Sequence, residues 1–109
     1  MSWLSKLFGG GKASDELQVA LDNRGLVVDV REPAEFAQGH LQGSVNYPLS
    51  KFNGSYKRLL KKHPNQALIL VCRSGNRSGQ AAQILRSNGA ECINGGSWQR
   101  VAALSKAQS

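Results

Sequence analysis

The chain is predicted to form one α/β domain with a central, mainly parallel sheet flanked by helices on both faces. Two short runs, 26–30 and 68–71, are rich in apolar and β-branched residues, which is typical of buried strands. Helical patterns alternate with these strands, an arrangement that favours parallel pairing through right-handed crossovers. A chain of 109 residues has room for one hydrophobic core and no second domain.

The individual elements follow from apolar spacing and from the residues that begin or end helices. The expected strands are 26–30, 45–47, 68–71 and 91–93. The expected helices are one capped by Ser14 that ends at 23–25, one from Pro33 through Phe36 that ends near Gly39, one over 55–62, and one around Ala81, Ile84 and Leu85 that ends at 88–89.

The N-terminal segment is interpreted as a unit separate from this domain. Its apolar residues fall at helical spacing, namely Trp3, Leu4, Leu7 and Phe8. The predicted boundaries are therefore 1–13 for an amphipathic segment with a Gly-rich hinge, and 14–109 for the folded domain. The first eight residues contain too few apolar side chains for a secretory signal, so we expect a cytoplasmic protein with reduced cysteines.

The net charge of +7, from 14 basic and 7 acidic residues, favours anionic partners. The dense basic cluster at 57–63 is interpreted as the solvated face of one helix, with Leu59 and Leu60 turned inward, rather than as a polyanion site. Nucleic-acid binding is not expected, because no aromatic-lined basic stripe or known motif accompanies the charge. Stable membrane insertion is not expected either, because no apolar run approaches the ~20 residues that a spanning helix needs.

The loop over 72–80 is the segment most informative about function. Cys72 directly follows a buried strand, at the position where open α/β sheets bind ligands, and a polar loop then leads into a helix. The backbone N–H groups of such a loop can form an anion site, and a positive environment favours the reactive thiolate. Arg73 and Arg77 add positive charge, and Gly75 permits a backbone conformation that a Cβ would disfavour. We therefore expect Cys72 to be a nucleophile rather than a buried structural cysteine.

Three segments resemble the signatures of the rhodanese family, in the same order and at similar spacing. The N-terminal signature region is similar over 28–32, 35–36 and 39–48, and the C-terminal signature over 95–98. The active-site loop is similar over Cys72, Arg73, Ser74, Gly75, Asn76, Arg77 and Ser78. The resemblance covers about residues 14–101 and implies the rhodanese-like fold.

The resemblance also implies a single-domain thiosulfate sulfurtransferase. Cys72 would attack the outer sulfur of thiosulfate, release sulfite and hold the sulfur as a persulfide, from which cyanide or a thiol acceptor would take it. The loop N–H groups would stabilise the bound sulfur, and Arg73 and Arg77 would orient the sulfonate of the donor. The guanidinium of Arg77 is expected to point toward the loop interior. A persulfide donor is equally compatible with these residues, and no metal or organic cofactor is implied.

Two other functions are weighed against this one. Phosphatase activity is disfavoured because the loop between Cys72 and Arg77 has four residues and is shorter than that of tyrosine phosphatases. A rhodanese-fold sulfur carrier or regulatory binding module without turnover is the second alternative. Loss of the cysteine would indicate such a module, and Cys72 is present.

The remaining candidate residues are given supporting or structural roles. For Asp29 and Arg31, at the end of the first buried strand, the resemblance implies a polar network that braces the loop, and a purely structural role is the alternative for each. His40 is interpreted as a structural residue in a turn, because a metal site needs more than one ligand. Trp98 is expected to pack on the core, with a place in the pocket wall as the alternative. Cys92 is interpreted as a core thiol rather than one half of a redox pair.

Overall fold

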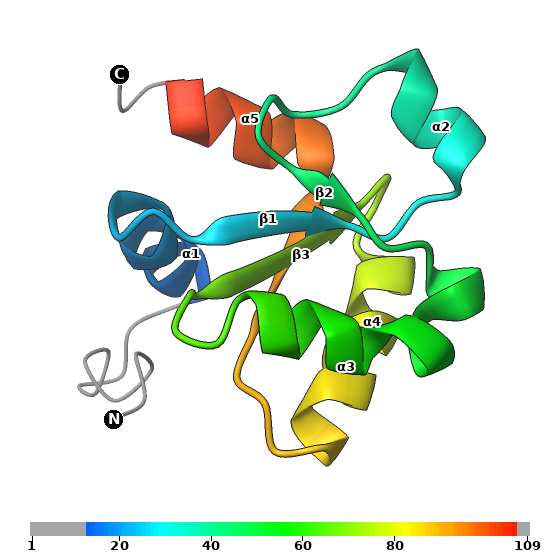
Figure 1. Ribbon diagram of the computed structural model, residues 1–109. Coiled ribbons are helices and arrows are strands. Elements are labelled where there is room, and N and C mark those ends of the chain that lie inside the picture. Colours follow the sequence, from blue (N-terminus) through cyan, green and yellow to red (C-terminus); the bar gives the residue numbers. More distant parts are fainter. Residues whose placement is uncertain (1–12, 107–109) are drawn as a thin grey trace.

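The structure is a computed structural model that describes residues 13–106 (Figure 1). Its centre is a four-stranded sheet in the order β2-β1-β3-β4, in which every neighbouring pair is parallel. The strands are β1 (Leu26–Asp29), β2 (Val45–Asn46), β3 (Leu68–Cys72) and β4 (Ile93–Ser97). The predicted parallel α/β architecture is confirmed.

Helices cover both faces of this sheet. They are α1 (Ala13–Asp22), α2 (Pro33–Gln38), α3 (Phe52–Lys62), α4 (Asn76–Ser87) and α5 (Trp98–Lys106), with a short 3-10 helix, η2 (Leu49–Lys51), before α3. Figure 1 shows α1 and α5 on one side of β1 and β3, and α3 and α4 on the other. Helix α2 lies near the carboxyl ends of β1 and β3 (Figure 1).

The core is divided into two clusters by the sheet. Successive strand residues point to opposite faces of the sheet. Val28 and Leu70 therefore pack toward α3 and α4, in the α3–α4 cluster, while Val27 and Ile69 pack toward α1 and α5, in the α1–α5 cluster. The strands β1 and β3 are therefore buried on both sides, which explains why their sequences are almost continuously apolar. The side chain of Cys72 belongs to the α3–α4 cluster.

The structure corrects three expected boundaries and adds one helix. Helix α1 begins at Ala13, so Ser14 lies within the helix and is not its N-cap. Helix α3 begins at Phe52 rather than at residue 55, since Phe52 is fully buried and anchors its first turn. The last strand is β4, from Ile93, rather than 91–93, and helix α5, which was not predicted, follows it directly.

Other expectations concern the surface and the N-terminus. In the basic segment of α3, Leu59 is fully buried, Leu60 is half-buried and the lysines are exposed, as the solvated-face interpretation predicted. No helix in the described part of the chain has the length and apolar character needed to cross a membrane. The predicted amphipathic segment and most of the hinge lie outside the described residues.

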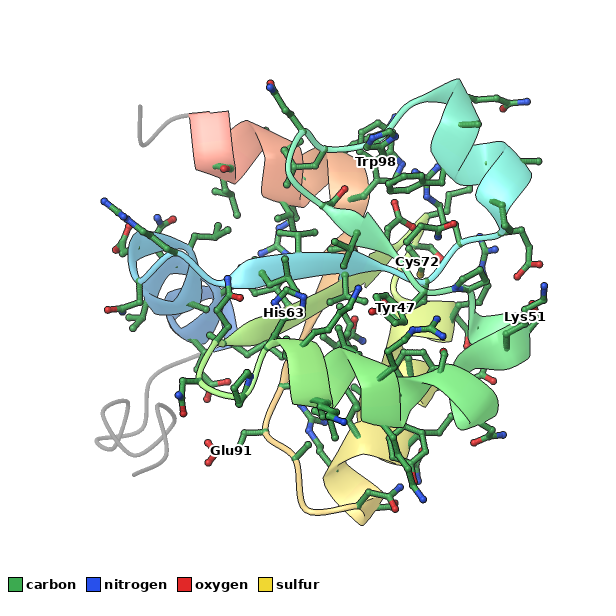
Figure 2. The ribbon with its side chains drawn as sticks, in the orientation of Figure 1. Tyr47, Lys51, His63, Cys72, Glu91 and Trp98 are labelled. Carbon is green, nitrogen blue, oxygen red and sulfur yellow. The ribbon has the colours of Figure 1, made fainter. Side chains whose placement is uncertain are left out.

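The parallel register brings the predicted site residues to one edge of the sheet. Asp29 at the end of β1 pairs with Val71 in β3, and Cys72 pairs with Ser97 in β4. The carboxyl ends of these strands, and the loops that follow them, therefore meet. Figure 2 shows Cys72 and Trp98 toward this end of the sheet, whereas His63 and Glu91 lie nearer the opposite end.

Candidate active site

Cys72 lies at the C-terminal end of β3, where the chain turns into α4. The residue is only 1% exposed, so only a small group can reach the sulfur. The backbone N–H of Gly75 donates to Sγ at 3.0 Å, and the Ser78 hydroxyl lies 3.4 Å from Sγ. Gly75 has φ +107°, in the left-handed region that favours glycine, which confirms why this loop position carries no Cβ.

The hydrogen bonds around the sulfur favour the thiolate. Burial raises the pKa of the Cys72 thiol, but the Ser78 hydroxyl and the backbone N–H groups of Ser78, Gly75 and Ser74 lower it. The downward contributions prevail, so the pKa lies below that of an ordinary cysteine. The loop thus provides the donors that a sulfur anion requires, because its N–H groups converge on one point.

Asn94 in β4 links the parts of this loop, and the sequence analysis did not identify it. Its Nδ2 donates to the carbonyl oxygen of Gly75 at 3.0 Å, and its Oδ1 accepts from the Gly96 N–H at 3.1 Å. The same Oδ1 accepts from the Ser78 hydroxyl at 2.6 Å. Asn94 therefore fixes both groups that contact the Cys72 sulfur. The only sequence signal for it is its place directly before the two glycines of the C-terminal signature.

The two arginines of the loop have different environments. The guanidinium of Arg77 donates to both carboxylate oxygens of Glu35 in α2, at 2.6 and 3.0 Å. The expectation that it points toward the loop interior is wrong, because this bidentate pair directs it to α2 instead. The Arg77 interaction lowers the pKa of Glu35 to about 2. Arg73 is exposed, and its guanidinium forms no hydrogen bond or ion pair with any described residue.

Asp29 and Arg31 form a second, buried ion pair beside the loop. Nη2 of Arg31 lies 2.8 Å from Oδ2 of Asp29, and both side chains are almost fully buried. The same guanidinium donates to the carbonyl oxygen of Gly39 at 2.8 Å and stands over the Trp98 ring, 4.8 Å from its centroid. The pair thus fastens the end of β1 to the C-terminus of α2 and to the start of α5. A direct bond from either side chain to the Cys72 loop is not part of this network.

A groove of about 520 Å³ opens beside the loop. Trp98 forms part of its wall while also packing on the α1–α5 cluster, so both predicted roles of Trp98 apply. The charged residues of the groove are Arg31, Glu35 and Arg73, and the others are Gln38, Gly39 and Gln99. Arg73 directly follows Cys72 in the chain, so the groove lies next to the active-site loop and contains one guanidinium that no described carboxylate pairs with.

The other singled-out side chains make contacts that do not involve the Cys72 sulfur. Asn76 accepts a hydrogen bond from Gln80 in the same helix, so its side chain is used within α4. His40 stacks on Phe36 and its Nδ1 lies 2.7 Å from the Phe36 carbonyl oxygen, which agrees with a structural role. Cys92 is buried near the carbonyl oxygen of Ala82, and burial raises the pKa of its thiol. Within residues 13–106, no group of three potential ligands could hold a metal ion.

The chain is similar to known proteins over this same region. The family model described as Rhodanese-like domain matches residues 13–104. Thiosulfate sulfurtransferase PspE of Escherichia coli is 36% identical over 64 residues, which are 57% of this chain and 59% of that protein. Thiosulfate:glutathione sulfurtransferase of Saccharomyces cerevisiae is 32% identical over 74 residues, covering 59% of this chain and 53% of that protein. The chain spans only part of its curated relatives: the match covers 59% of PspE, 48% of the uncharacterized protein YqhL of Bacillus subtilis and 36% of an uncharacterized protein of Synechocystis.

Solved structures agree with the sequence relatives. A rhodanese with anions from Escherichia coli superposes with a TM-score of 0.60 at 32% identity, over 69% of this chain and 88% of that one. The human single-domain sulfurtransferase TSTD1 superposes with a TM-score of 0.59 at 26% identity, over 84% of this chain and 92% of that one. The family model covers nearly all of the described residues, and the loop after β3 holds its cysteine within a ring of N–H donors. The chain belongs to the rhodanese-like domain family.

Proposed function

We propose that this protein is a sulfurtransferase that carries sulfane sulfur as a persulfide on Cys72. The observation that carries the proposal is the placement of the Cys72 sulfur at the centre of a loop whose Gly75 N–H donates to it at 3.0 Å. A depressed thiol pKa supplies the nucleophile, and the same N–H groups can stabilise a second sulfur bound to the first. Names of relatives support the class: PspE is a thiosulfate sulfurtransferase and YrkF of Bacillus subtilis is a putative sulfur carrier.

The reaction divides into two displacements at sulfur. The Cys72 thiolate attacks the outer sulfur of thiosulfate, an S–S bond forms to Cys72, and the S–S bond of thiosulfate breaks with release of sulfite. In the second step cyanide attacks the outer sulfur of the persulfide, thiocyanate leaves and the thiolate returns. With a thiol acceptor the thiolate of the acceptor attacks, and a new persulfide leaves. Each step conserves electrons without an external oxidant, which is ordinary covalent catalysis.

The first testable prediction is a persulfide at one position. Incubation with thiosulfate should make the protein heavier by one sulfur atom, and peptide mapping should locate that atom on Cys72. Cys72→Ser should show no adduct, whereas Cys92→Ser should behave as the parent protein does, because Cys92 is buried and its pKa is raised. An adduct on Cys92 would contradict the assignment.

Reaction with cyanide then distinguishes a sulfurtransferase from a binding module without turnover. Addition of cyanide to the persulfidated protein should release thiocyanate and restore the original mass, with repeated turnover when thiosulfate is in excess. A persulfide that forms but is not passed to cyanide or to a thiol would instead identify a binding module without turnover.

A further inference from the structure

Three arginines lie at the active-site edge, and two of them are already neutralised. Arg31 is paired with the buried Asp29, and Arg77 is paired with Glu35 through both Nη atoms. Arg73 is the groove residue whose positive charge no described carboxylate neutralises. An anionic sulfur donor that enters the groove therefore meets one free guanidinium rather than two.

Glu35 also lines the groove beside the active-site loop. It does so together with Arg73, and its side chain is about one-third exposed. The negative charge of Glu35 is retained well into the acid range, since its pKa is about 2. The carboxylate of Glu35 thus cancels the positive charge that Arg77 would otherwise offer to an anionic donor.

We propose that Glu35 is a specificity-determining residue that keeps Arg77 paired and so disfavours doubly charged sulfur donors relative to singly charged persulfides. The inference rests on the proposed sulfur transfer. It follows from electrostatics, because the interaction of a fixed charge with a donor grows in proportion to the charge of the donor. Thiosulfate carries two negative charges, and an alkyl hydropersulfide anion carries one.

Both donors deliver the same sulfur to Cys72. With an alkyl hydropersulfide, the Cys72 thiolate attacks the outer sulfur, the new S–S bond forms, and the alkyl thiolate leaves with the electron pair of the broken S–S bond. The two reactions share the nucleophile and the loop donors, so a difference between them reports on the charge of the donor and its leaving group.

Glu35→Gln tests this role with little change of shape. Glutamine can still accept the backbone hydrogen bond that Glu35 receives from the Glu32 N–H at 3.1 Å, and it has no charge. The second-order rate constant of persulfide formation should rise about threefold with ethyl hydropersulfide and about ninefold with thiosulfate, since a nearby surface charge changes binding by roughly a factor of three per unit of donor charge. Arg73→Ala should act in the opposite direction, with the larger loss for thiosulfate.

Glu32→Gln is the matched control. Glu32 is an exposed carboxylate at the start of α2, but it accepts hydrogen bonds from Ser50 rather than from Arg77, and its influence on Arg77 is weaker than that of Glu35. The control should change either rate constant by less than about twofold. A rate with thiosulfate that falls in Glu35→Gln, or a change that is equal for both donors, would overturn the proposal.

Measuring the binding of thiosulfate directly, in a protein without the nucleophile, makes the test independent of turnover. Calorimetric titration of thiosulfate into Cys72→Ser, with and without Glu35→Gln, should show tighter binding in the double variant. If the parent protein forms no persulfide with either donor, the proposed function fails, whatever this titration shows. If persulfide forms but the double variant binds thiosulfate no more tightly, only the role of Glu35 is refuted.

Discussion

At the scale of single residues, the reactivity of Cys72 depends on where the Ser78 hydroxyl directs its hydrogen, to the Cys72 sulfur or to Asn94. The Ser78 hydroxyl has one hydrogen, and it lies between the Asn94 Oδ1 at 2.6 Å and the Cys72 Sγ at 3.4 Å. While Cys72 is a thiol, its S–H can donate to the hydroxyl oxygen, and the hydroxyl donates to Asn94. Once the thiolate forms, the hydroxyl can turn its hydrogen to the sulfur and stabilise the charge.

The second prediction follows from this arrangement. Ser78→Ala should raise the pKa of the Cys72 thiol, because the hydroxyl no longer donates to the thiolate. Asn94→Ala should also raise it, because the Gly75 N–H and the Ser78 side chain lose the amide that positions them. The measurement is the rate of alkylation against pH, with a midpoint at higher pH and a several-fold lower rate at neutral pH.

Asn88→Ala is the control for Asn94→Ala, because it also removes a side-chain amide that makes hydrogen bonds. Asn88 also makes two side-chain hydrogen bonds, to Tyr56 and to the Ile84 carbonyl oxygen, but it lies at the far end of α4 from the sulfur. Its removal should leave the alkylation midpoint unchanged. A midpoint that falls in Asn94→Ala would mean that Asn94 mainly competes with the sulfur for the Ser78 proton.

The sequence predicts the residues near Cys72 far better than those that act on it from a distance. Gly75 and Ser78 stand within six positions of the nucleophile, so the loop motif includes them. Asn94 is 16 positions from Ser78, and Glu35 is 42 positions from Arg77. Only the folded sheet brings these partners together, and a local pattern contains no information about such pairs.

At the scale of secondary structure, β4 shows where a strand pattern misleads. Residues 91–93 have the composition of a strand, yet β4 runs from Ile93 through two glycines that strand preferences disfavour. A Cβ on Gly95 would lie 2.8 Å from a methyl carbon of Ile69 and 3.1 Å from one of Val71. Close packing on β3 therefore requires glycine in this strand, and packing overrides propensity.

Helix α5 was missed although its signal is present. Trp98, Val101 and Leu104 recur at helical spacing, and all three pack on the α1–α5 cluster. By contrast, the fully apolar strand β3 was identified to within one residue, because a strand buried on both faces has little freedom in composition. The sequence is thus most informative where burial is complete on both sides.

The third prediction compares two glycines in regular structure. Gly95→Ala should reduce the free energy of unfolding by about 1–3 kcal/mol, because the added methyl group displaces β4 from β3. Gly54→Ala should raise it by about 0.5–1 kcal/mol, because Gly54 lies in α3 with no atom near the new methyl group. Urea unfolding of both variants measures the difference. Equal stability of the two variants would show that β4 can move away from β3 without cost.

At the scale of the whole molecule, lowering the pH adds positive charge to a protein whose net charge is already strongly positive. The net charge is +7 near neutrality, so each carboxylate that becomes protonated increases the repulsion within the folded state. Glu35 resists this protonation because Arg77 holds its pKa at about 2, below the ordinary carboxyl value. A depressed folded pKa means that the pair contributes stability above about pH 4.5, and that the contribution is lost as the pH falls through about 2.

The last prediction isolates that contribution. Between pH 5 and pH 2, the free energy of unfolding of the parent protein should fall more steeply than that of Glu35→Gln, which has no carboxylate to protonate at this position. The difference should be less than about 1 kcal/mol, because both side chains of the pair are about one-third exposed and water screens them. Repeating the denaturant titrations in ~1 M salt should shrink the difference further, since the Debye length is then only about 3 Å. Parallel pH profiles for the two proteins in low salt would mean that the Glu35–Arg77 pair adds nothing to stability, and its role would then be confined to the active-site groove.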